Sequence, residues 1–65
     1  MSLYDYKVSQ ELDKADTPFY ALIMAAMRRA DTDNLSRFKA LFPQTFEELK
    51  KRYNAPGGQL PEDGG

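Results

Sequence analysis

The feature that most constrains this chain is an uninterrupted apolar run, FYALIMAAM, over residues 19–27. A surface helix keeps one polar face, whereas this run is apolar on every side when it is wound into a helix. Such a helix must be covered all round, and a chain of 65 residues offers little material to cover it. The run therefore predicts a central helix wrapped by other helices, with a second copy or a partner covering what they leave exposed.

The composition leaves self-association as the expected stabiliser of so small a domain. The chain contains no cysteine and no histidine. Disulfides and thiolate sites are therefore excluded, and the commonest metal ligand and general base are missing. The remaining hydroxyls have no evident activating partner. We expect a protein that is not an enzyme, with no catalytic residues, no metal and no cofactor.

The apolar run does not predict a membrane segment. It is shorter than the roughly 20 residues that a spanning helix needs. The segment before it is acidic, and Arg28 and Arg29 follow where the cleavage site of a signal peptide would lie. We expect a soluble, cytoplasmic protein.

Charge is unevenly distributed around a net value of −1. Residues 1–17 carry −2, residues 18–53 carry +3 and residues 54–65 carry −2. This basic centre is weaker than the footprint of a typical nucleic-acid-binding protein. The bases at 50–52 follow a turn, as in a DNA-recognition helix, but Glu47 and Glu48 occupy the end that would meet DNA, and Pro43 stands in the turn. Nucleic acid is therefore disfavoured as a partner.

Periodicity and punctuation predict an all-α domain over residues 1–54, a small bundle of three to four short helices around the central apolar helix. The helices are expected at residues 4–15, from 18 to about 30, from just after position 32 or 33 to about 41, and from a start between 43 and 45 to about 53. Tyr4, Tyr6 and Val8 also alternate as in a strand, but no second strand is available to pair with them. The predicted core consists of apolar positions at helical spacing: Val8, Leu12, Phe19, Leu22, Ile23, Ala26, Leu35, Phe38, Leu41, Phe46, Leu49 and Tyr53.

Several residues predict where these helices begin and end. Asp16 or Thr17 is expected to cap the second helix, with Pro18 at its first position. Thr32 or Asp33 is expected to cap the third helix, and Thr45 with Glu48 has the spacing of a capping box for the fourth. Asn54 is expected to close the fourth helix in a left-handed conformation. Residues 55–65, with all four glycines, are expected to form a flexible Pro/Gly-rich tail.

Three groups of residues are candidate sites. Tyr20, Met24 and Met27 form one side of the central helix and suit an interface with a second copy or a protein partner. Asp31, Asp33 and Asn34 resemble the start of a calcium loop, but the required glycine and glutamate are replaced by Ser36 and Phe42. The third group has the residue types that bind a small anionic ligand such as a nucleotide: Arg28, Arg29, Arg52, Tyr53, Asn54, Gly57 and Gly58.

The strings DTPFYALIMAAMRRADTDNL, LFP and LKKRYNAPGG resemble small uncharacterised helical proteins encoded in phages, prophages and bacterial genomes. The resemblance covers about two-thirds of the chain, from Asp16 to Gly58. It implies no particular activity and no functional residues. It implies the context of small accessory proteins, which act as inhibitors or adaptors of a host protein or sequester a small molecule. We therefore expect a non-catalytic binding protein that associates with itself.

Overall fold

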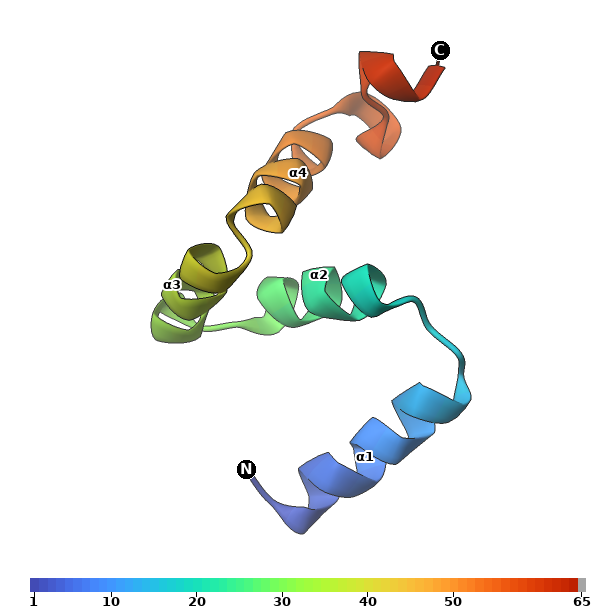
Figure 1. Cartoon of the computed structure of the whole chain (residues 1–65), viewed down its shortest axis with the longest axis vertical. Helices are drawn as coiled ribbons and strands as arrows, with labels where there is room; N and C mark the ends of the chain where they lie inside the picture. Colours follow the sequence, from blue (N-terminus) through green and yellow to red (C-terminus); the bar gives the residue numbers. More distant parts are fainter. Residues whose placement is uncertain (65) are drawn as a thin grey trace.

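The computed structural model describes residues 1–64 and confirms the all-α fold class. Four helices, α1 (Leu3–Lys14), α2 (Phe19–Arg29), α3 (Thr32–Leu41) and α4 (Pro43–Tyr53), precede two short 3-10 turns at Pro56–Gly58 and Pro61–Gly64 (Figure 1). No strand forms among the described residues, so the alternating residues near the N-terminus lie within a helix. In the same part of the chain, no helix is long and apolar enough to cross a membrane.

The N-termini of α1 and α3 are capped by side chains that sequence analysis did not select. The Ser2 hydroxyl accepts the Asp5 N–H at 3.2 Å, and the Asp5 carboxylate accepts the Ser2 N–H at 3.0 Å. This reciprocal pair is a capping box that starts α1 close to the N-terminus. Asp31, rather than either of the two residues after it, caps α3 by accepting the Asn34 N–H at 2.8 Å.

Prolines lie at the starts of α2 and α4, and the side-chain caps predicted for these two helices do not form. Pro18 lies at the N-cap of α2, and no side chain caps this helix. Asp16, one of the two predicted caps, instead lies after the end of α1 with a left-handed φ of 55°. Pro43 occupies the first turn of α4, where its fixed φ suits a helix start. The helix therefore begins before Thr45, and the expected capping box between Thr45 and Glu48 does not form.

Helices α2, α3 and α4 pack against one another and form what we call the body. Helix α1, which we call the arm, packs against none of them and diverges from α2 (Figure 1). An open hollow of about 640 Å³ separates the arm from Arg29 at the end of α2. The central helix is therefore covered on the side of α3 and α4 but not by the arm.

The centre of the body is Met27, which is 3% exposed and is the one fully buried residue among those described. Around it, six predicted core residues are half-buried: Leu22, Ile23, Leu35, Phe38, Phe46 and Leu49. The other six are exposed, contrary to the prediction: Val8, Leu12, Phe19, Ala26, Leu41 and Tyr53. The two from the arm are exposed because the arm does not pack on the body. Phe19 contacts the Phe42 ring edge-on, at 6.4 Å between centroids, without becoming buried.

The C-terminal segment, expected to be a Pro/Gly-rich tail, forms two 3-10 turns. Its two 3-10 turns fold back on α4, where the Arg52 guanidinium donates to the Gly58 carbonyl and to the Asp63 carboxylate. This ion pair links residues eleven positions apart, so no local pattern of glycine and proline reveals it. Gly65 lies outside the described residues.

Replacing the buried methionine tests the centre of the body. Met27→Ala removes side-chain contacts from α3 and α4 and is expected to lower the free energy of unfolding by about 2–3 kcal/mol. Leu41→Ala, at a residue that is 74% exposed, is the matched control and should change it by less than about 0.5 kcal/mol. Urea denaturation of both variants followed by circular dichroism measures the difference. Equal effects of the two substitutions would contradict this assignment of the core.

Candidate functional site

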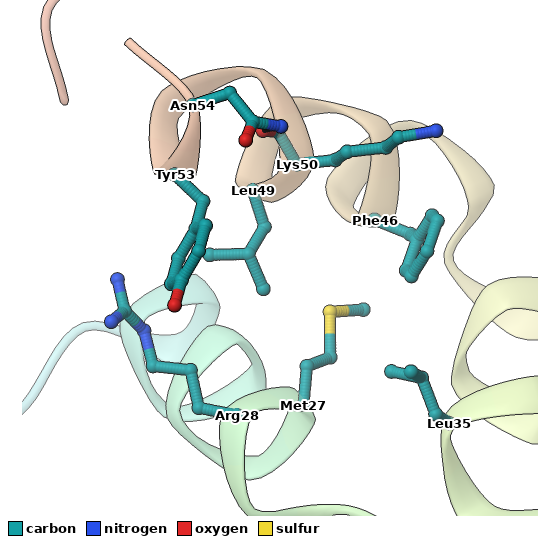
Figure 2. A pocket seen from close by; sticks show the side chains of 8 residues that line it. All are labelled: Met27, Arg28, Leu35, Phe46, Leu49, Lys50, Tyr53 and Asn54. Carbon is teal, nitrogen blue, oxygen red and sulfur yellow. Dashed lines mark hydrogen bonds between the residues drawn. The ribbon is translucent and has the colours of Figure 1, made fainter. Parts of the chain in front are cut away.

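A groove of about 290 Å³ lies between α2 and α4 and is closed at one end by α3. We call it the basic groove. It is lined by two residues of α2, one of α3, four of α4 and the residue after α4: Met27, Arg28, Leu35, Phe46, Leu49, Lys50, Tyr53 and Asn54. In Figure 2, Met27 and Leu49 point into the space between the helices, and Arg28 extends beside Tyr53.

Helical spacing brings the lining residues of α4 to one face. Phe46, Leu49 or Lys50, and Tyr53 or Asn54 recur at intervals of three and four residues, which places them one above another. Phe46 and Leu49 are half-buried and form an apolar floor over Met27. The polar residues that line the groove beside this floor are Arg28, Lys50, Tyr53 and Asn54.

The rim of the basic groove is cationic. Arg28 and Lys50 contribute a positive charge from each of the two helices, and none of the lining residues is acidic. Within residues 1–64, neither cation takes part in an ion pair. Outside the groove, the Lys39 ammonium lies 5.3 Å from the centroid of the Phe46 ring. The groove therefore combines an apolar floor with two cationic lining residues.

The structure brings together three of the predicted ligand residues, Arg28, Tyr53 and Asn54, in the basic groove. Asn54 is not left-handed as predicted, having a φ of −91°, and its amide donates to the Lys50 carbonyl at 2.9 Å. Arg29 is directed elsewhere and borders the hollow beside the arm. Lys50 was missed as a site residue, although its spacing of four residues from Phe46 and Asn54 is the signal that places it on this face.

Arg52, Gly57 and Gly58 lie outside the basic groove, in a second arrangement that we call the clasp. Arg52 Nη1 donates to the Gly58 carbonyl at 3.0 Å and to Asp63 Oδ2, and Nη2 donates to Asp63 Oδ1 at 2.9 Å. Glu48 approaches the same guanidinium at 3.4 Å. The predicted anion site around Arg52 is therefore already filled by a carboxylate of the chain itself.

The two glycines of the clasp serve the turn rather than an anion cradle. Gly57 and Gly58 have φ values of 62° and 70°, which favour glycine over other residues. The Gly58 N–H donates to the Ala55 carbonyl at 3.0 Å, so it is occupied within the turn. The turn instead presents the Gly58 carbonyl to Arg52, which favours a cation and not an anion.

Hydrogen bonding perturbs the pKa values of both charged partners in the clasp. The Arg52 hydrogen bonds hold the pKa of Asp63 far below its ordinary value, and the Leu60 N–H, which donates to Oδ2 at 3.0 Å, lowers it further. The Asp63 carboxylate in turn raises the pKa of Arg52 above its usual range. The clasp therefore keeps both charges paired across the physiological pH range.

The three residues predicted for an interface are separated by the fold. Tyr20 and Met24 border a shallow hollow of about 250 Å³ together with Gln44, Thr45 and Glu48 near the start of α4. Met27 is instead buried in the body and is not available at the surface of a single chain. Met27 and Met24 therefore differ in burial. Met27 faces the place where α3 and α4 meet, whereas Met24 borders the shallow hollow near the start of α4.

No protein-family model, curated protein or solved structure matches this chain. Among residues 1–64, no three His, Cys, Asp or Glu side chains cluster in a way that could hold a metal ion. The function is therefore argued from the arm, the basic groove and the clasp.

The clasp is expected to open in acid. Because the pKa of Asp63 is lowered on folding, the stabilisation it contributes is present above the ordinary aspartate value of 3.8 and is lost as pH falls below it. NMR titration of the Asp63 carboxyl carbon should give a midpoint below 3.8 in the native chain. Arg52→Gln should move that midpoint upward, and a native midpoint at 3.8 or higher would contradict the clasp.

Proposed function

We propose that this chain is a non-catalytic binding protein that works by associating with other chains, beginning with copies of itself. The observation that carries the proposal is the uncovered apolar stripe of the arm. Tyr4 and Leu12 are 75% and 49% exposed, and Val8 lies between them on the same face. A helix of this length is marginal in water unless its apolar face packs against something.

The small extent of the body supports the same proposal. With Met27 as its fully buried residue, the body alone buries little apolar surface. Domains of this size commonly gain the missing burial by assembling. Phe19 and Tyr20, each 58% exposed, extend the uncovered apolar surface from the arm to the start of α2. The resemblance to small phage proteins is compatible with an accessory role, such as inhibition of a host protein.

Substitutions on the two faces of the arm test this function. Leu12→Ser removes a large apolar group from the stripe and is expected to weaken self-association at least about tenfold. Gln10→Ser, on the opposite face of the same helix, is the matched control and should leave association unchanged. Sedimentation velocity over a range of concentrations measures both variants. If the Leu12→Ser variant associates as strongly as the native chain, the arm does not mediate self-association.

A second candidate function is the binding of a small anionic ligand such as a nucleotide. It is favoured by the Arg28 guanidinium, which lies beside the Tyr53 ring at the edge of an apolar floor (Figure 2). Guanidinium and ammonium groups bind phosphate, and a tyrosine ring can stack on a base. In this second function, the groove would sequester its ligand without chemical conversion.

Thermal shifts with a panel of nucleotides test the second candidate. A nucleotide that binds in the basic groove should stabilise the native chain, and Arg28→Ala should abolish most of that shift. Arg37→Ala, at an exposed arginine outside the groove, is the control and should retain it. If no nucleotide shifts the melting temperature, or if both variants retain the shift, the groove is not a nucleotide site.

A further inference from the structure

Two uncovered surfaces of this chain complement each other: the apolar stripe of the arm and the basic groove of the body. We infer that the arm of one copy lies in the basic groove of a second copy. This inference rests on the proposed self-association and assigns its two contact surfaces. The arm offers Tyr4, Val8 and Leu12, and the groove offers a floor of Phe46 and Leu49 over Met27.

The two surfaces match in length. The stripe runs from Tyr4 to Leu12, and eight residues of helix span about 12 Å. The groove runs along α4 from Phe46 to Asn54, which is again eight residues and about 12 Å. Three apolar side chains at successive turns of the arm can therefore contact the groove along its whole length.

The two surfaces also match in charge. At about 3.6 residues per turn, Asp5 and Glu11 are the charged residues nearest the stripe, one on each side of it. Asp5 also takes part in the Ser2 capping box, and Glu11 forms an exposed ion pair with Lys14 at 3.4 Å. The groove presents Arg28 from α2 and Lys50 from α4, and no acidic residue lines it. Pairing the acidic borders of the arm with this cationic rim would fix the orientation of the arm in the groove. Repulsion between acidic borders would disfavour direct packing of one arm on another.

The groove of the same chain does not receive its own arm. The linker at residues 15–18 joins the arm to the start of α2, and the arm's stripe borders an open hollow with Arg29 rather than with the residues that line the groove. Arg28 and Tyr53 line the groove elsewhere on the body. Because every copy carries both an arm and a groove, two copies related by a two-fold axis make the contact twice.

Complementation between two defective variants tests the inference. Leu12→Lys puts a positive charge in the stripe and should damage the arm, while the paired substitution Arg28→Glu and Lys50→Glu should damage the groove. Each variant alone is expected to lose self-association at least about tenfold. An equimolar mixture is expected to form a 1:1 complex, because the intact arm of the groove variant fits the intact groove of the arm variant.

Exposed positions beside the two surfaces supply the controls. Gln10→Lys adds charge to the other face of the arm, and Lys51→Glu reverses charge on α4 outside the groove, so both should associate as the native chain does. Circular dichroism of each variant should retain the native helix content. Native mass spectrometry with one partner isotopically labelled distinguishes the 1:1 complex from either variant alone.

Three results would overturn the inference, and they separate it from the proposed function. If the groove variant associates as the native chain does while the arm variant does not, self-association stands but the arm binds elsewhere. If the groove variant loses only a nucleotide-induced thermal shift, a small anion occupies the groove. A native chain that stays monomeric at all concentrations overturns both.

Discussion

The rest of this structure depends on how α2, an apolar helix, is covered on one side. Met27 lies where α2, α3 and α4 meet, and its burial holds these helices together as the body. Pro43 and the Asp31 cap fix the two short connections that bring α3 and α4 to that side. As a result, Met27 is buried on the side of α2 that faces α3 and α4. Large apolar residues that do not face this side, such as Phe19 and Tyr20, remain exposed.

The arm and the basic groove follow from this incomplete packing. The arm has a well-capped start at Ser2 and a regular apolar stripe, yet no other helix among residues 1–64 packs against it. The groove has an apolar floor with a cationic rim, which favours an acidic amphipathic helix or an anionic ligand. Such surfaces contribute free energy only when something covers them.

The helices were predictable from sequence, whereas their packing was not. Prolines 18 and 43 and apolar periodicity locate the helices because these signals act within a few residues. Sequence could not show whether Met24 or Met27 is buried, since α2 is apolar on every side and either face could be turned inward. The convergence of Arg28 with Tyr53, and the ion pair of Arg52 with Asp63, depend on contacts between separate segments.

The central claim is that the arm is stabilised by another copy of the chain. Amide hydrogen exchange at several protein concentrations tests it most directly, because each amide reports the local stability of its own helix. The account predicts that protection in residues 3–14 rises with concentration, and rises more than protection in residues 19–53. Protection of residues 3–14 that is independent of concentration, while the chain is measurably associated, would contradict it.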